Sequence, residues 1–167
     1  MDILRWGYEE KGTFTTKEAY NIIIKEHIIK DALWSKIWDS SNWLKVSTFL
    51  WLLCQNKILT WDDLRKRNFN GPSICPNCKQ EEEKIIHLMQ TCHIGHKLWE
   101  KVSFHYQKEG RIHGDIRAIV CNWNQSPYKR KLLNTLWKLI PSLLMWNIWK
   151  ERNHRIFKSQ SMSIEKL

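Results

Sequence analysis

Three cysteines and one histidine stand close together in the middle of the chain, in the order Cys75-x2-Cys78-x8-His87-x4-Cys92. Two cysteines separated by a Pro-Asn pair can grip one metal ion from a tight turn. Three thiolates and one imidazole fill a tetrahedral shell and leave no position for water, as in structural zinc sites. Soft sulfur ligands exclude magnesium and calcium. The spacing therefore predicts one structural Zn²⁺; the alternative is a loop of small buried thiols without metal.

Other histidines and cysteines compete for a role at this site. His93 and His96 are near enough in the sequence to replace His87 as the nitrogen ligand, although His96 is expected on the following helix, exposed or half-buried. Cys54 falls in an apolar segment and is expected in the core, while Cys121 has no partner at metal-binding spacing. An odd total of five cysteines favours a metal site over a disulfide framework.

The charge of the metal loop argues against contact with phosphate groups. Residues 75–92 carry two lysines and three glutamates, and zinc with three thiolates adds further negative charge. An acidic loop binds a phosphate backbone poorly. We therefore expect the zinc ion to stabilise the fold, because metal-binding free energy becomes folding free energy. Any contact with nucleic acid should come from another part of the chain.

The elements that must position this loop are predicted to be helices. Apolar residues recur at helical spacing, or follow a helix-capping signal, in five stretches: residues 13–30, 33–38, 44–56, 60–70 and 128–157. A further helix is expected after the metal loop, carrying Leu98, Trp99, Val102 and Tyr106. Residues 44–56 are apolar almost all round, which predicts a central buried helix. Few stretches alternate with period two, so strands are expected at most as a short β-hairpin inside the metal loop.

Capping signals define where several of these helices begin and end. Either Thr15 or Thr16 is expected to cap the first helix, and Thr60 the fourth. Glu18 in the first turn of one, and the Asp62-Asp63 pair in the first turn of the other, suit the helix dipole. The fourth helix should stop before a Gly-Pro pair at residues 71–72.

Prolines and glycines interrupt two stretches in the second half of the chain. Pro141 removes a hydrogen-bond donor, so residues 128–157 form either one kinked helix or two helices. Residues 110–127 hold two glycines and a proline and are predicted to be irregular. The fold class is therefore mainly α: one domain with a helical part at residues 13–69, a zinc loop at 73–92, a second helical part at 93–157 and a tail at 158–167.

Net charge indicates the kind of partner. The chain has 167 residues, is 43% hydrophobic and carries a formal charge of +10, with 14 basic and 5 acidic residues after position 92. This balance favours an anionic partner, RNA or DNA rather than an acidic membrane. The alternative is a solvated basic surface. The predicted nucleic-acid contacts are Lys129, Arg130, Lys131, Lys150, Arg152, Arg155 and Lys158.

Several other function classes find no support in the sequence. The apolar stretch 132–149 is interrupted by Lys138 and Pro141, which a bilayer tolerates poorly, and no signal peptide is visible at the N-terminus. The Asp62-Asp63 pair follows a helix cap rather than a polymerase-type Tyr-x-Asp-Asp hairpin. No glycine-rich phosphate loop or GxSxG sequence is present. Neither autonomous catalysis, a small-molecule substrate nor a membrane partner is expected.

Longer motifs resemble a known family. The segment CPNCKQEEEKIIHLMQTC, followed by HKLW, resembles the zinc-binding domain downstream of the polymerase in plant LINE-type (non-LTR) reverse transcriptases. Four other segments match that domain in order and spacing: GTFTTKEAY (12–20), LWSKIW (33–38), FLWLLCQNKILTWDDLRKRNF (49–69) and WNIWKERNHRIF (146–157). The chain departs from the family pattern at residues 42–45, where a Pro-Pro-Lys-like stretch is usual, and at Leu52, where a basic residue is common.

The resemblance carries its own expectations. It implies that Cys75, Cys78, His87 and Cys92 ligate one structural zinc ion, and that the domain assists a reverse transcriptase body in handling RNA or DNA. It also implies a nuclear location, because the family acts on chromosomal DNA. The 167 residues contain neither the polymerase nor the ribonuclease H that usually flank the domain. The alternative is a zinc-stabilised docking domain without affinity for nucleic acid.

Overall fold

The computed structural model of the chain describes residues 14–20, 32–39, 41–106, 114–123 and 126–163. The chain divides into two compact units, residues 1–32 and residues 33–167. In the first unit, residues 16–20 are helical. Thr15 is the cap of this helix, since its Oγ1 accepts a hydrogen bond from the Glu18 N–H at 3.1 Å. The rest of the helix predicted up to residue 30 falls outside the described residues.

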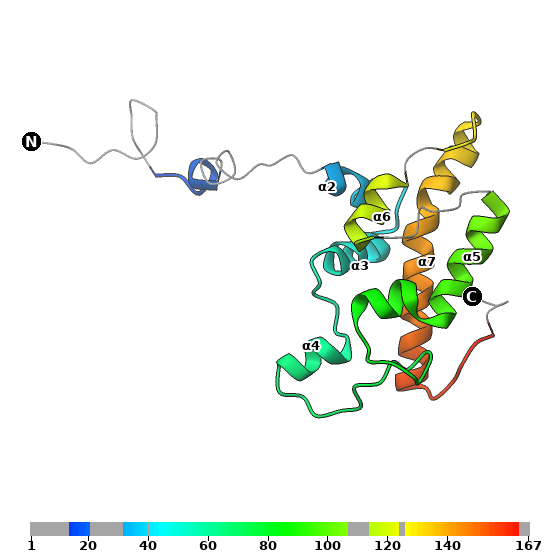
Figure 1. The fold of residues 1–167 in the computed structure, drawn as a ribbon. Helices are drawn as coiled ribbons and strands as arrows, with labels where there is room; N and C mark the ends of the chain where they lie inside the picture. Colours follow the sequence, from blue (N-terminus) through cyan, green and yellow to red (C-terminus); the bar gives the residue numbers. More distant parts are fainter. Residues whose placement is uncertain (1–13, 21–31, 40, 107–113, 124–125, 164–167) are drawn as a thin grey trace, which may run out of the picture. The chain divides into compact units, whose positions relative to one another are not determined.

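The second unit is built from helices, as predicted. They are α2 (Ala32–Ile37), α3 (Leu44–Cys54), α4 (Trp61–Lys66), the π-helical turn η1 (His87–Thr91), α5 (His93–Tyr106), α6 (Ile116–Asn122) and α7 (Lys131–Phe157) (Figure 1). In the described part of the chain, the predicted hairpin is reduced to one antiparallel bridge between Ile74 and Glu82. No helix in the described ranges combines the length and the apolar character of a membrane span.

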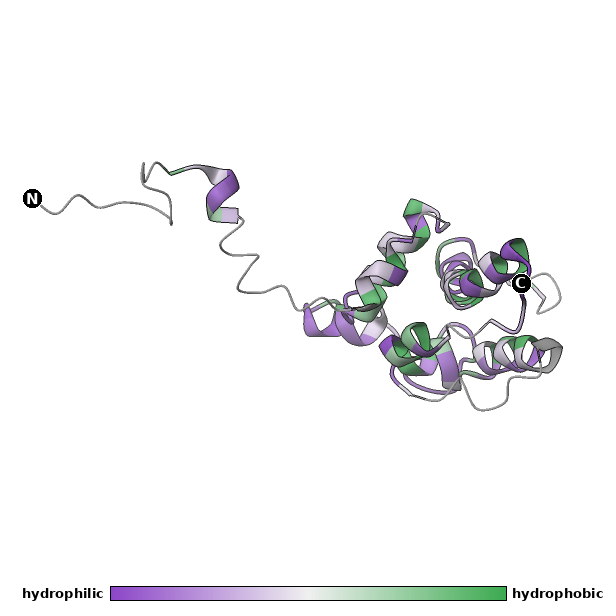
Figure 2. Ribbon diagram, turned by 90° about the horizontal axis from the view of Figure 1, so that it is seen from above, coloured by the Kyte–Doolittle hydropathy of each residue, from purple (hydrophilic) through white to green (hydrophobic). Residues whose placement is uncertain are grey.

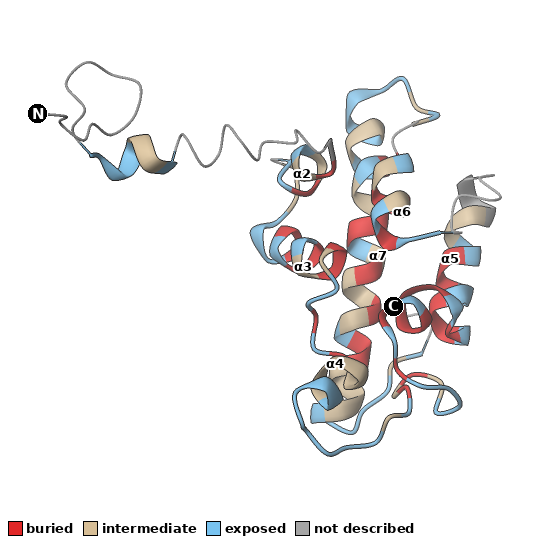
Figure 3. Cartoon of the chain, turned by 60° about the vertical axis from the view of Figure 1, so that its left-hand side comes forward, coloured by how far each residue is buried: buried red, intermediate tan, exposed pale blue. Residues whose placement is uncertain are grey.

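Helix α7 is the centre of the second unit. In Figure 1 it passes between α3 and α6 on one side and α5 on the other, and all three helices contact it. Its inward side chains, including Trp137, Met145 and Ile148, are almost completely buried. Figure 3 shows the buried residues on the faces that meet α7, and Figure 2 shows hydrophobic and hydrophilic residues sharing each helix. The core is therefore made by amphipathic helices packed around one long helix.

Helix α3 differs from the prediction that residues 44–56 are buried all round. Its inner face is buried at Val46, Leu50 and Leu53. Its other face is partly open, and Leu44 and Trp51 are 74% and 37% exposed. Only α6 and α7 make substantial packing contacts with α3 among the described elements. Burial against the described helices of the second unit therefore does not account for the apolar character of this outer face.

Pro141 does not divide α7. A proline at this position cannot donate to the carbonyl of Trp137, four residues earlier. The indole N–H of Trp123 donates to that carbonyl instead, at 2.9 Å. In return, the indole N–H of Trp137 donates to the Trp123 carbonyl at 3.2 Å, and the two rings stack with centroids 4.9 Å apart. A side chain from the end of α6 thus replaces the missing helix bond, and α7 continues over 27 residues.

We expect Trp123→Phe to destabilise the chain by about 1–3 kcal/mol beyond the effect of ring size, because the buried Trp137 carbonyl loses its donor. Chemical denaturation measures the change. The Pro141→Ala background restores a backbone N–H, so the same substitution should cost clearly less there. Equal costs in the two backgrounds would show that the indole bond does not compensate for the proline.

Helix α6 was not expected, because residues 110–127 were predicted to be irregular. Asp115 occupies the N-cap position of α6 in extended conformation. Ile116, Ile119 and Val120 then recur at helical spacing and are buried. This short signal was obscured by the glycines and the proline around it, and packing on α3 and α7 stabilises a helix of only seven residues.

Candidate metal centre

The four predicted ligands lie together. The sulfur atoms of Cys75, Cys78 and Cys92 and a ring nitrogen of His87 are all within 4.8 Å of one another. The Cys75 and Cys92 sulfurs are 4.0 Å apart, and the Cys78 sulfur is 3.2 Å from His87 Nε2. No other group of three or more such side chains comes together in the described ranges of the chain. The prediction of this ligand cluster from spacing is confirmed.

The separations fit a tetrahedral zinc shell. Zinc–sulfur bonds of about 2.3 Å give a sulfur–sulfur edge of about 3.8 Å, close to the observed 4.0 Å. The same separation is far too long for a disulfide, and none of the five cysteines is disulfide-bonded. Cys75 and Cys92 are completely buried, and His87 is 7% exposed. The donor set therefore suits one zinc ion enclosed by protein, with no position left for a substrate.

Two tight turns deliver the ligands from opposite sides. In the first, the Lys79 N–H donates to the Cys75 carbonyl at 2.8 Å, and the bridge between Ile74 and Glu82 closes the loop around it. In the second, η1, the Cys92 N–H donates to the His87 carbonyl at 2.7 Å. This bond spans five residues, so the x4 spacing places His87 and Cys92 one π-helical turn apart.

Backbone groups and neighbouring thiols set the charge of the sulfurs. The Cys75 thiol donates to the Cys92 sulfur, and burial acts in the same direction, so the pKa of Cys75 lies well above its ordinary value. The same bond lowers the pKa of Cys92, to which the N–H groups of Ile94 and Gly95 also contribute. Cys92 is therefore the readier thiolate, and zinc must displace the proton of Cys75.

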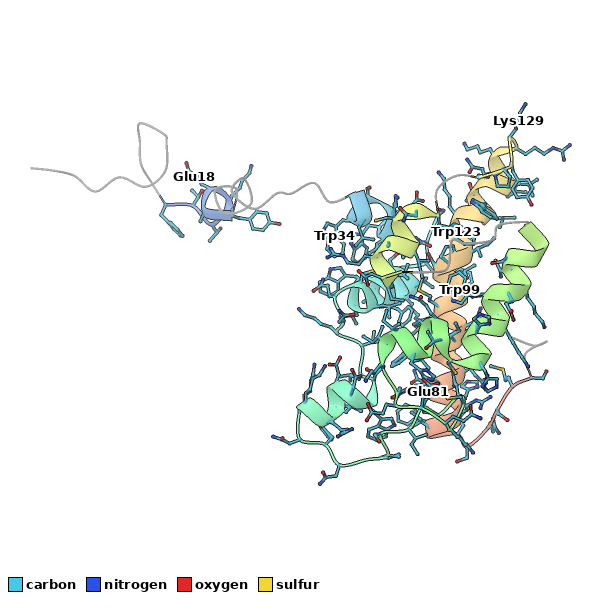
Figure 4. All side chains as sticks on the ribbon, in the orientation of Figure 1. Glu18, Trp34, Glu81, Trp99, Trp123 and Lys129 are labelled. Carbon is cyan, nitrogen blue, oxygen red and sulfur yellow. The ribbon has the colours of Figure 1, made fainter. Side chains whose placement is uncertain are left out.

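His87 is oriented by partners on its second nitrogen. Nδ1 lies 3.0 Å from Glu81 Oε2 and 3.2 Å from Thr91 Oγ1. With Nδ1 donating to the carboxylate, Nε2 presents its lone pair toward the Cys78 sulfur and the centre of the cluster. A carboxylate behind a metal-binding histidine fixes the tautomer and increases ligand basicity. Glu81, labelled in Figure 4, lies in the metal loop itself.

We expect Glu81→Gln to weaken zinc binding about tenfold or more, because the carboxylate that orients His87 is lost. Competition with a chromophoric zinc chelator measures the affinity. Glu82→Gln is the matched control, since Glu82 lies next in the same loop, is highly exposed and loses the same charge. If the two variants bind zinc with equal affinity, the contact between Glu81 and His87 has no role in metal binding.

An ion pair joins the metal loop to α7. Arg152 donates to both oxygens of Glu83, at 2.8 and 2.9 Å, and the two side chains are 4% and 0% exposed. Glu83 also accepts the backbone N–H of Trp61 at the start of α4, and Arg152 donates to the Leu59 carbonyl. This buried pair therefore connects α7, the metal loop and the segment that leads into α4.

Arg155 makes a second connection at the same end of α7. It donates to the carbonyl of Asn77, inside the cysteine turn, at 2.9 Å, and to Glu151, which is completely buried, at 2.6 Å. The prediction that Arg152 and Arg155 form a phosphate-binding face is therefore corrected. Arg152 is 3% exposed. Arg155 is half-buried, with 19% of its side chain exposed and its guanidinium bonded to Glu151 and the Asn77 carbonyl, because this helix face packs against the metal loop.

The other predicted site residues are distributed as follows. The five remaining cations are exposed: Lys129, Arg130, Lys131, Lys150 and Lys158. Lys129, labelled in Figure 4, stands just before the start of α7. His93 and His96 lie on α5, are exposed and are outside the ligand cluster. Cys54 is buried in α3, and Cys121 is half-buried at the end of α6, so neither belongs to the metal centre.

Two acidic residues of this centre, Glu81 and Glu83, do not stand out in the sequence. In the sequence, Glu81, Glu82 and Glu83 indicate only negative charge on a loop. Their side chains have three different environments: Glu81 contacts His87, Glu82 is exposed, and Glu83 is buried against Arg152. The structure distinguishes Glu83 because Ile74 pairs with Glu82 and the next side chain is buried.

Comparison with known proteins bears on the identity of the chain. A family profile described as "zinc-binding in reverse transcriptase" matches residues 14–99, just over half of the chain, and includes all four ligands. An Arabidopsis thaliana protein named "Putative ribonuclease H protein" is 22% identical over 161 residues. The match covers 93% of this chain but only 25% of that relative, so the chain spans about a quarter of its length. No solved structure matches the chain. The four-ligand cluster and the profile match together show that this chain belongs to the family of zinc-binding domains in reverse transcriptases.

Proposed function

We propose that this chain is the non-catalytic zinc-binding module of a LINE-type retroelement reverse transcriptase, and that it assists the binding of RNA or DNA. The observation that carries the proposal is the enclosed Cys75-Cys78-His87-Cys92 cluster in a chain of this family. A shell filled by four protein ligands has no open position for catalysis, so its role is structural. The reverse transcriptase that this module assists is part of the same polypeptide or is a separate protein. Because such an enzyme acts on chromosomal DNA, the proposal includes a nuclear location.

The net charge supports nucleic acid as the partner. The chain carries +10 overall, and the excess lies after the metal loop. Lys129, Arg130 and Lys131 are exposed and adjacent at the start of α7. Arg152, in contrast, is buried and is not available for contact with a phosphate group. Three neighbouring cations at one end of the longest helix can follow a phosphate backbone without reading sequence. Lys150, near the other end of α7, and Lys158, just after it, are exposed as well.

The name of the Arabidopsis relative refers to a second activity, ribonuclease H, which we do not propose for this chain. The chain spans about a quarter of that protein. We propose that this chain supplies the zinc-binding part of such an assembly, and that hydrolysis belongs to other parts. Purified zinc-loaded chain should therefore leave an RNA–DNA hybrid intact in the presence of Mg²⁺, as gel analysis of labelled hybrid would show.

We expect the variant Lys129→Ala/Arg130→Ala/Lys131→Ala to bind RNA and DNA more weakly and with a smaller salt dependence. Loss of three phosphate contacts should reduce the slope of log affinity against log salt by about 2–3. Fluorescence anisotropy with labelled single- and double-stranded RNA and DNA, across a salt series, measures both quantities.

The matched control removes three exposed lysines from the metal loop and α5: Lys79→Ala/Lys84→Ala/Lys97→Ala. It should keep most of the salt slope, because the metal loop is acidic. If the unmodified chain has no affinity for any of the four nucleic acids at low salt, the nucleic-acid part of the proposal is wrong. The alternative, a zinc-stabilised domain that docks on another protein, then holds.

A further inference from the structure

A groove of about 410 Å³ opens between α3, the segment after it and α7. Its lining is almost entirely apolar and consists chiefly of Phe49, Leu52, Ile58, Leu59, Trp146 and Trp149. Phe49 forms the floor, with its ring centroid 5.2 Å from Trp146 and 6.0 Å from Trp149. Leu59, on the rim, is 45% exposed. The groove lies wholly within the second unit and is separate from the metal centre.

The chemistry of the lining suits aliphatic side chains better than nucleic-acid bases. Thr48 is the one uncharged polar residue of the groove, and its hydroxyl already donates to the Leu44 carbonyl at 2.9 Å. A base needs an open aromatic face for stacking. Phe49 stacks on Trp149, and the Arg152 guanidinium lies over the same ring at 4.8 Å. The Trp149 ring is therefore engaged inside the protein. The apolar floor offers a base neither an open Trp149 face nor an unused hydroxyl proton.

The rim of the groove is positively charged. Lys45 stands at the start of α3, and Lys57 follows its end, so the two lysines flank the apolar floor. No carboxylate is among the lining residues that the structure describes. This arrangement favours an occupant with acidic residues on both sides of an apolar stretch. It disfavours a second copy of this chain, whose net charge is +10.

We propose that this groove binds an amphipathic helix of a partner protein, with leucine-like side chains on one face and acidic residues at both ends of that face. Lys45, Thr48, Phe49 and Leu52 form one stripe on α3, at the spacing that lines a helix-binding groove. The α3 helix spans about 16 Å, enough for two to three turns of a bound helix.

The test uses the full zinc-loaded chain and a helical peptide-display library as the probe. Selection against the unmodified chain is compared with selection against Leu59→Ser, which changes one exposed groove residue. We expect enriched peptides with apolar residues at helical spacing flanked by Asp or Glu. Binding of the best peptide, measured by anisotropy, should fall about tenfold in Leu59→Ser and in Lys45→Glu/Lys57→Glu. It should be unchanged in the controls Leu132→Ser and Lys97→Glu, which lie outside the groove.

Exchanging the charges of the peptide flanks and of the two groove lysines distinguishes specific docking from nonspecific hydrophobic binding. A peptide in which lysines replace the acidic flanks should bind Lys45→Glu/Lys57→Glu and not the unmodified chain. The proposal is overturned if the selected peptides are basic, or if they bind Leu59→Ser as tightly as the unmodified chain. It is also overturned if the Leu59→Ser substitution abolishes RNA binding or a self-association seen by sedimentation, because the groove then serves nucleic acid or a second copy.

Discussion

The Cys78→Ser variant is expected to lose its zinc ion and the fold of the metal loop with it. Cys78 is one of four ligands in an enclosed shell, and a serine hydroxyl is a poor zinc ligand. The apparent free energy of structural zinc binding reaches about 10–16 kcal/mol in zinc-finger peptides, as large as the whole stability of a typical domain. The loss should extend beyond the loop, because Trp99 of α5 is buried and its indole N–H donates to the Met89 carbonyl in η1.

Metal analysis and thermal unfolding by circular dichroism measure these effects. The unmodified chain should contain one zinc ion, and Cys78→Ser almost none. Loss of roughly 5 kcal/mol lowers the Tm of a chain of this size by roughly 10–20 °C. Chelation of the unmodified chain should reproduce the shift. Cys121→Ser is the matched control, since Cys121 is equally half-buried but outside the cluster. A substoichiometric zinc content in the unmodified chain would contradict the metal assignment.

The Arg152→Ala variant is expected to be destabilised by about 3–5 kcal/mol. The substitution leaves Glu83 buried without its charged partner, and breaking one half of a buried ion pair has a cost of this size. It also removes the donor to the Leu59 carbonyl and the cation over Trp149. Urea unfolding measures the free energy. Lys150→Ala, an exposed cation two residues earlier on α7, should change the stability by less than about 0.5 kcal/mol.

A second variant distinguishes the loss of the pair from the loss of the charge. Glu83→Leu/Arg152→Met replaces both partners with apolar groups and should recover much of the stability, because neither charge is then buried alone. Under conditions where Arg152→Ala is folded, its nucleic-acid affinity should equal that of the unmodified chain. If Arg152→Ala is as stable as the unmodified chain but binds RNA less tightly, Arg152 contacts nucleic acid and does not stabilise the fold.

The two variants act on one structural arrangement. The metal centre fixes the loop, and Glu83 and the Asn77 carbonyl hold that loop to Arg152 and Arg155 at the end of α7. The zinc ion therefore stabilises a junction between the metal loop and the central helix. The cysteine motif and the motif WNIWKERNHRIF, with 53 residues between them in the sequence, therefore meet at this junction.

The sequence by itself determined the metal centre and most of the helices. Ligand spacing is local: a two-residue gap defines one turn and the x4 gap defines another, so Cys75, Cys78, His87 and Cys92 were identified without tertiary information. The threonine at position 60 and the acidic first turn of α4 are equally local signals, and α4 begins directly after Thr60. The Thr60 hydroxyl donates to the Asp62 carboxylate and makes no capping bond to the backbone. Helix α5 follows the same logic, since its apolar residues recur at helical spacing.

Only the tertiary structure decided which charges are buried. Arg152 and Lys150 look alike in the sequence, yet one is buried against Glu83 and the other is exposed. Burial of a charge depends on a partner from a distant segment, here 69 residues away, and spacing along one helix cannot reveal that partner. The continuity of α7 through Pro141 has the same origin, because the compensating donor, Trp123, belongs to another element. Local rules describe the turns and helices, and long-range pairing decides which of their side chains remain free to meet a partner.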